Sequence, residues 1–133
     1  MPATTTPPHT ITSRKDIATT FLRMASSGEV REAFERHVSP QFRHHNPYFR
    51  GDAKTLAKGM EENAKQNPDK ALDVEHALED GDLVAVHSRV RLKPAAQEMA
   101  LVHIFRFVGD RIVELWDIGQ PVPADSPNEN GMF

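Results

Sequence analysis

The chain has 133 residues, which is enough for one domain and too short for a second full one. It carries 16 Lys and Arg against 19 Asp and Glu, a net charge of −3, so no basic surface for nucleic acid or anionic lipid is expected. Cysteine is absent, which excludes disulfides and thiolate metal sites. Seven histidines are the unusual feature, because histidine titrates near neutral pH and is the commonest metal ligand.

The two ends of the chain are rich in proline, which resists regular structure. We therefore expect a mobile arm over residues 1–12, one domain over 13–120 and an extended tail over 121–133. No apolar run approaches the roughly 20 residues that span a bilayer, and the N-terminus has no secretory signal pattern. We expect a cytoplasmic protein with no membrane partner.

Three helices are predicted in the first half of the chain. Ser13 starts a capping pattern, and Gly28 is a natural stop for the helix that follows it. Between them, apolar residues recur at helical spacing at Ile17, Phe21 and Met24. A second, short helix follows from Val30 and ends before Ser39-Pro40. Asp52 is the expected N-cap of a third helix, which stops at Asn67-Pro68.

Strand patterns fill the rest of the chain. A short strand is expected over residues 41–46, between the second and third helices. Apolar and polar residues then alternate over four further segments, 72–78, 83–92, 99–108 and 111–120. Short turns such as Gly109-Asp110 join these segments as hairpins, so they form an antiparallel meander. Helices segregated from such a sheet define an α+β domain.

Four segments of the chain carry a resemblance to a known family. They are His45-Asn46-Pro47, residues 80–87 (DGDLVAVH), residues 103–106 (HIFR) and, most specifically, residues 112–123 (IVELWDIGQPVP). Together with the order of elements they resemble the SnoaL-like branch of the nuclear transport factor 2-like fold, which includes polyketide cyclases and predicted aldol-condensation enzymes. The resemblance covers roughly residues 13–133.

The resemblance implies three helices on a strongly curved, mainly antiparallel sheet that forms a cone with a cavity, in a homodimer. It also implies acid–base chemistry without metal or cofactor on a small, largely apolar carbonyl compound. In such cyclases an Asp on the last strand is the acid/base, and a His fourteen residues earlier is its companion. Asp117 and His103 stand at that spacing. Two positions depart from the pattern, Leu115 where His is frequent and His44 where Gln is frequent.

An aldol closure removes a proton from the carbon next to a carbonyl and delivers a proton to the carbonyl oxygen under attack. One carboxylate can do both if its pKa is raised toward neutrality, as burial in an apolar pocket would do for Asp117. A neutral His103 would hold the carboxylate or donate to an enolate oxygen, whereas a protonated His103 would lower the pKa of Asp117. The residues expected to contact the substrate are His45, Asn46, Tyr48, Phe105 and Trp116.

Register places a condition on this pair. If Gly109-Asp110 is a two-residue turn in a regular hairpin, His103 lies opposite Trp116, and the side chains of His103 and Asp117 point to opposite faces. A three-residue loop or one bulge would return them to the same face. The hypothesis of a joint site therefore requires an irregularity in this hairpin.

The same residues also admit structural roles. Asp117 could pair with Arg106 or Arg111, His103 could be a satisfied core histidine, and residues 45–47 could simply end a strand. No metal site is predicted, because the chain has no H-E-x-x-H motif and no two histidines four apart on a helix.

Three further functions remain as alternatives. The pocket could serve an isomerase, dehydratase or epoxide hydrolase, it could bind a small molecule without catalysis in a dimer, or the tail could pack on a partner subunit in an interaction module. The fold alone does not decide among them.

Overall fold

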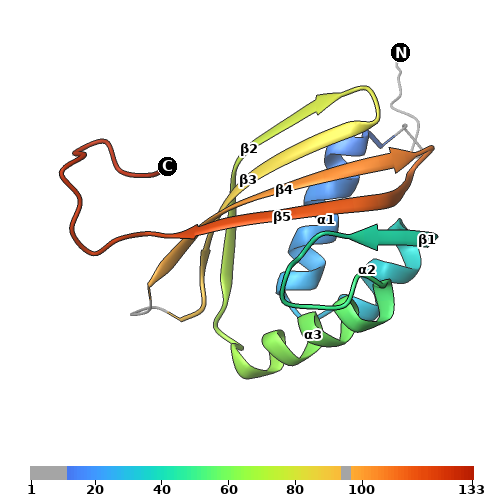
Figure 1. Cartoon of the computed structure of the whole chain (residues 1–133), viewed down its shortest axis with the longest axis horizontal. Coiled ribbons are helices and arrows are strands. Elements are labelled where there is room, and N and C mark those ends of the chain that lie inside the picture. The colour runs from blue at the N-terminus through green and yellow to red at the C-terminus, as the bar shows by residue number, and fades with distance from the viewer. Residues whose placement is uncertain (1–11, 94–96) are drawn as a thin grey trace, which may run out of the picture.

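The computed structural model describes residues 12–93 and 97–133 (Figure 1). It confirms an α+β domain with three helices packed on a five-stranded sheet. The elements are α1 (Arg14–Ser26), α2 (Val30–His37), β1 (Val38–His44), α3 (Ala53–Gln66), β2 (Ala71–Asp80), β3 (Leu83–Arg91), β4 (Glu98–Val108) and β5 (Arg111–Pro121). The arm expected over residues 1–12 lies outside the described residues, apart from Thr12.

The helix ends follow the predicted capping residues. The Ser13 hydroxyl accepts a hydrogen bond from the backbone N–H of Asp16 at 3.1 Å, and Asp52 accepts one from the N–H of Thr55 at 2.9 Å. Each satisfies one of the N–H groups that a helix leaves unpaired in its first turn. Gly28 follows α1 with a φ of +96°, a conformation that glycine adopts without strain.

The strand order is β1-β5-β4-β3-β2. The last four strands form the predicted antiparallel meander, and β1 pairs in parallel with β5 at the edge of the sheet. The bounds expected for this first strand, 41–46, were wrong, because β1 runs from Val38 to His44 through Pro40. An edge strand tolerates proline since one side of it needs no N–H donors, and the pairing of β1 is irregular between Val38 and Arg43.

The hairpin of β4 and β5 contains the irregularity that a joint site requires. Val108 pairs with Arg111 and Phe107 with Ile112, as in a regular two-residue hairpin. The next pair is Arg106 with Glu114, so Val113 is an extra residue in β5, a β-bulge. From there on the register is moved by one residue, and His103 lies directly opposite Asp117. The two side chains therefore share one face of the sheet.

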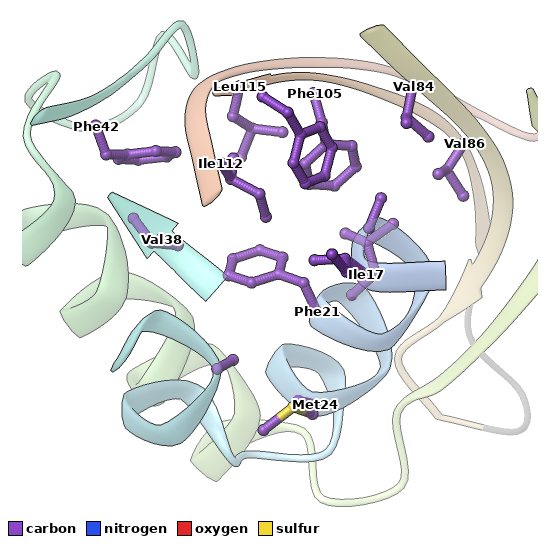
Figure 2. Close-up of a cluster of buried hydrophobic side chains, with 14 of the residues drawn as sticks. Ile17, Phe21, Met24, Val38, Phe42, Val84, Val86, Phe105, Ile112 and Leu115 are labelled. Carbon is purple, nitrogen blue, oxygen red and sulfur yellow. The ribbon is translucent and has the colours of Figure 1, made fainter. Parts of the chain in front are cut away.

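The hydrophobic core lies between α1 and the face of the sheet that curves around it (Figure 2). Phe21 of α1 is completely buried and meets the ring of Phe105 edge to face, with the ring centroids 6.0 Å apart. This inner face also carries Ile112 and Leu115. The core fills one end of the curved sheet and holds α1 in place.

The segment after β5 has neither helix nor strand and turns back toward the sheet (Figure 1). The ring of Phe133 stacks on His87 with the centroids 5.8 Å apart, and the Arg89 guanidinium lies 4.1 Å from its centre. Both partners belong to β3 of the same chain. The tail predicted over 121–133 is thus anchored at its last residue.

Candidate functional site

A cavity of about 450 Å³ lies at the other end of the inner face, between the sheet and helices α1 and α3. Its walls are mainly apolar side chains, among them Leu22, Leu56, Met60, Leu72, Val90 and Leu101. A volume of this size suits a small organic ligand. His103 and Asp117 both line the cavity, which places a carboxylate and an imidazole against an otherwise apolar space.

Asp117 is fixed through both of its oxygens. Its Oδ1 lies 3.4 Å from Nε2 of His103, and its Oδ2 accepts a hydrogen bond of 2.9 Å from the side-chain amide of Asn46. The other end of that amide, Oδ1, accepts from the backbone N–H of Tyr48 at 3.0 Å, so the NH₂ group faces Asp117. The carboxylate is oriented, and its side chain keeps 21% of its surface exposed.

These contacts decide the protonation of Asp117. Burial raises its pKa, but the hydrogen bonds from His103 and Asn46, together with electrostatic interactions with His103 and His44, lower it more. The net result is a pKa below the usual value for Asp. The sequence left both a raised and a lowered pKa open, and the contacts in the structure favour the lowered one. Asp117 is a carboxylate at neutral pH.

His103 is buried, and its Nδ1 has no hydrogen-bond partner in the part of the chain that the structure describes. The proton of a neutral His103 thus belongs on Nε2, because on Nδ1 it would lack an acceptor and Nε2 would face the Asp117 oxygen without a proton. In this tautomer the Nε2–H group of His103 is directed at the Asp117 oxygen that lies 3.4 Å away.

His44 organises the loop that presents Asn46. Its side chain is buried, Nδ1 accepts from the backbone N–H of Asn46 at 3.1 Å, and Nε2 donates to the carbonyl of Arg50 at 2.6 Å. The backbone N–H of His44 also donates to Gly51 at 3.3 Å. Sequence reasoning gave His44 no role, since nothing local shows that its ring joins the two ends of this loop.

Lys70 is a second charged side chain at the cavity, and sequence reasoning missed it as well. It lies just before β2, and its Nζ donates to the Oδ1 of Asn63 at 2.7 Å. In the sequence Lys70 is a polar residue two positions after the Asn67-Pro68 stop, and no recognisable motif surrounds it. Its place at the cavity depends on the turn between α3 and β2 and on its hydrogen bond to Asn63 of α3.

Five residues were predicted to contact the substrate, and in the structure only two of them line the cavity. Asn46 and Tyr48 line the cavity, Tyr48 with 87% of its surface exposed at the mouth. Phe105 is completely buried in the core, away from the cavity lining. His45 and Trp116 do not line it either, because their neighbours His44 and Asp117 face inward and strand side chains alternate. The predicted contact of these last three with a ligand in this cavity does not agree with the structure.

His45 and Trp116 belong instead to a cluster on the outer face of the sheet. Their rings stack 5.1 Å apart, and His45 Nε2 lies 2.7 Å from a carboxylate oxygen of Glu114. Glu114 also accepts hydrogen bonds from Arg43 and Arg106 at about 3.0 Å, although its side chain is only 6% exposed. The hydrogen bond from His45, with those from the two arginines, outweighs burial and lowers the pKa of Glu114 to about 2. This cluster joins β1, β4 and β5.

Two further histidines pair with each other on the sheet. His76 and His87 face each other across β2 and β3 with their Nδ1 atoms 3.0 Å apart. Among the described residues, no group of three or more His, Asp or Glu side chains is placed to hold a metal ion. None of the helices within those residues is long and apolar enough to cross a membrane.

Comparison with known families identifies the domain. The family model of the SnoaL-like domain matches residues 18–115, and the chain therefore belongs to this family. That assignment agrees with the fold and with the resemblance found in the sequence. A search among curated proteins finds no match.

Solved structures with the same fold include three informative ones. An NTF2-like protein of unknown function from Cytophaga hutchinsonii is 14% identical with a TM-score of 0.68, over 84% of this chain and 94% of that one. AclR from Streptomyces galilaeus, named "a putative hydroxylase", is 24% identical with a TM-score of 0.67, over 80% and 88%. IdmH from Streptomyces antibioticus, named "a putative polyketide cyclase", is 23% identical with a TM-score of 0.65, over 82% and 93%. At these identities the likeness establishes the fold.

Proposed function

We propose that the protein is an acid–base enzyme that enolises a small, largely apolar carbonyl compound, with an aldol-type cyclisation as the overall reaction. The observation that carries the proposal is the oriented Asp117 carboxylate, held by His103 and Asn46 at the wall of an apolar cavity. The description of IdmH as "a putative polyketide cyclase" is in keeping with it.

In this reaction Asp117 acts first as general base. Its carboxylate takes a proton from the carbon next to the ligand's carbonyl, and the resulting carboxylic acid is then placed to protonate an oxygen. His103 keeps the carboxylate directed into the cavity through Nε2. The chemistry requires no metal or cofactor, because the base, its orienting groups and the apolar surroundings all come from the chain itself.

Hydrogen–deuterium exchange tests this proposal without knowledge of the natural substrate. The protein is incubated in D₂O with 2-tetralone, an apolar ketone that fits a cavity of this size, and exchange next to the carbonyl is followed by NMR. Asp117→Asn should slow the catalysed exchange by about 100-fold or more, the usual contribution of a general base. The ketone's dissociation constant should change little, because Asn keeps the shape of Asp.

Asp110→Asn, in the exposed turn between β4 and β5, is the matched control and should exchange at the wild-type rate. Equal exchange by wild type and Asp117→Asn would contradict the role of Asp117. Binding of 2-tetralone with no catalysed exchange would favour the alternative, a non-catalytic ligand-binding protein, for which the mainly apolar lining is the supporting observation.

We also propose that the protein is a homodimer, as the resemblance to the SnoaL-like family implies. The outer face of the sheet, which carries Trp116 and the 58% exposed Ile118, supports this, because the three helices cover the opposite face (Figure 1).

A further inference from the structure

Among the residues that line the cavity within the described ranges, Lys70 is the one Lys or Arg and Asp117 the one Asp or Glu. They come from different segments, Lys70 from the turn between α3 and β2 and Asp117 from β5. His103 also lines the cavity, but its Nε2 faces Asp117, so Lys70 is the cation that an oxygen becoming negative here can contact.

The two charges attract without pairing. The oxygens of Asp117 contact His103 and Asn46, whereas the Lys70 ammonium donates one of its three N–H groups to Asn63. Asn63 is the one acceptor that Lys70 has among the described residues. Two N–H groups therefore remain to bind a ligand, and Asn63 holds the ammonium in position.

We propose that Lys70, positioned by Asn63, binds the ligand oxygen that becomes negative when Asp117 removes the proton. The inference rests on the proposed function and adds a second catalytic residue to it. The C–H electron pair forms the new C=C bond, the C=O π pair moves onto oxygen, and the proton goes to Asp117. The negative charge thus passes from the carboxylate to an enolate oxygen, which the ammonium binds without giving up a proton.

The lowered pKa of Asp117 means that the reaction needs a group that stabilises the enolate. A carboxylate with a lowered pKa is a weak base, so proton removal from carbon proceeds only if the enolate is itself stabilised. Lys70 is half-buried, and a charge with little surrounding water acts on its neighbours more strongly than an exposed one. Burial lowers the pKa of Lys70, while the charge of Asp117 raises it, which helps to keep the ammonium protonated.

A second cavity beside Lys70 is a less suitable place for the anion. It has about 420 Å³ and lies against residues at the carboxyl ends of α1 and α3, including Ser26 and Lys65. The carboxyl end of a helix carries partial negative charge, which repels an anion. The side of Lys70 that faces Asp117 and the apolar walls is therefore the one that receives the oxygen.

The test uses 4-nitrophenol at pH 8, where the probe is largely a phenolate whose charged oxygen and flat ring imitate an enolate. Asp117→Asn is the parent protein, because the amide imitates the neutral acid that exists once the proton has moved. Phenolate binding is followed by visible absorbance, and binding of neutral 4-nitrotoluene, the uncharged probe of the same shape, by isothermal titration. The variants compared are Asp117→Asn alone and Asp117→Asn combined with Lys70→Met, Lys70→Arg or Lys65→Met.

Lys70→Met should weaken phenolate binding about tenfold and leave 4-nitrotoluene binding within about twofold, since it removes charge-assisted hydrogen bonds and keeps the apolar bulk. Lys70→Arg should retain part of the preference for phenolate, and Lys65→Met should match the parent. Equal losses for both probes, or no loss with Lys70→Met while circular dichroism and the melting temperature match the parent, would overturn the assignment.

This result is independent of the test of the general base. Loss of exchange in Asp117→Asn together with unchanged phenolate binding in the Lys70→Met variant would leave the proposed function standing and remove Lys70 from it. In the otherwise wild-type protein, Lys70→Met should lower kcat for 2-tetralone exchange more than it raises KM, because the ammonium acts mainly on the charge that forms during the reaction.

Discussion

At the scale of single residues, the orientation of the Asp117 carboxylate depends on a short chain of contacts that begins in the loop after β1. His44 fixes the loop because its Nε2 donates to the carbonyl of Arg50 and its Nδ1 accepts from the N–H of Asn46, and the side chain of Asn46 in turn holds Asp117. Asn46 is a positioning residue in this arrangement, and its amide lowers the pKa of Asp117. The pH dependence of proton exchange is therefore sensitive to a residue that takes no proton itself.

Asn46→Ala should raise the pKa of Asp117, because burial then acts against one donor fewer. The base works only when deprotonated, so the acid limb of the 2-tetralone exchange profile should move to higher pH, while the rate at neutral pH changes less. The measurement is the exchange rate as a function of pH. Tyr48→Phe is the control, because Asn46 bonds the backbone of residue 48 and not its side chain. An acid limb that stays in place in Asn46→Ala contradicts the prediction.

Glu114 offers a separate prediction for stability. Its pKa falls from 4.5 to about 2 in the folded protein, so the carboxylate stabilises the fold fully above pH 4.5, and this stabilisation is lost as the pH falls toward about 2. Glu114→Gln should lower the free energy of unfolding by about 2 kcal/mol at pH 7, since it leaves two arginines without their anion. Urea denaturation should show this difference shrinking between pH 4.5 and pH 2.

The exposed Glu62→Gln on α3 should have almost no effect across the same pH range. A loss in Glu114→Gln that is the same at pH 7 and near pH 2 would show that packing, and not the ionised cluster, is what the substitution removes.

At the scale of elements, local chemistry in the sequence predicted where helices begin and where hairpins turn. Ser13 and Asp52 act as caps within a few residues of chain, so their roles can be read locally. The bulge at Val113 is different. Ile112 and Val113 are both apolar, so the pattern of β5 does not show which of them is the extra residue. The sequence therefore indicates that this hairpin needs an irregularity but not where it lies.

The alternation of side chains along a strand could have shown in advance that Asp117 and Trp116 do not face the same cavity. If Asp117 points into the cone, its neighbour Trp116 points out, and the sequence alone contains that conclusion. Phe105 lies on the same inner face as His103, so alternation does not exclude it. It is absent from the cavity wall because its end of the sheet is filled by the hydrophobic core.

Gly59 in the middle of α3 makes room for a wall of the cavity. A Cβ at this position would lie 2.4 Å from Cε1 of the Phe49 ring, and both residues line the cavity. Gly59→Ala should displace this ring and weaken 2-tetralone binding several-fold. Stability should change by less than about 1 kcal/mol, because the better helix propensity of Ala offsets the displaced contact. Isothermal titration and thermal melts measure the two effects.

Lys58→Ala, on the exposed side of the same helix, should leave 2-tetralone binding unchanged. Unchanged binding in Gly59→Ala would mean that the Phe49 ring moves without affecting the ligand.

At the scale of the whole molecule, the site combines segments that are distant in the chain. Asn46 and Asp117 are 71 residues apart, and Lys70 reaches the same cavity from a third segment. The family resemblance could indicate Asp117 and His103 because they belong to its motif. It could not indicate Lys70, whose place at the cavity follows from the turn after α3 and from its hydrogen bond to Asn63.

The proposed homodimer would form through the outer face of the sheet, on the side away from the cavity. Val102, Ile104, Trp116 and Ile118 face outward from β4 and β5, where no helix covers them within the described ranges. Ile118→Arg should put a charge into this apolar face and convert the dimer to a monomer, because an unpaired charge buried between two sheets is strongly unfavourable. Sedimentation velocity at matched micromolar concentrations measures the mass.

Val108→Arg is the control and should stay dimeric, because Val108 is 64% exposed at the end of the β4–β5 hairpin, away from the apolar face. A monomeric wild type, or an Ile118→Arg variant as dimeric as the wild type, would place the interface elsewhere or remove it. A monomeric Ile118→Arg that still exchanges 2-tetralone at the wild-type rate would show that each cavity works within one subunit, as expected when His103, Asn46, Lys70 and Asp117 all come from the same chain.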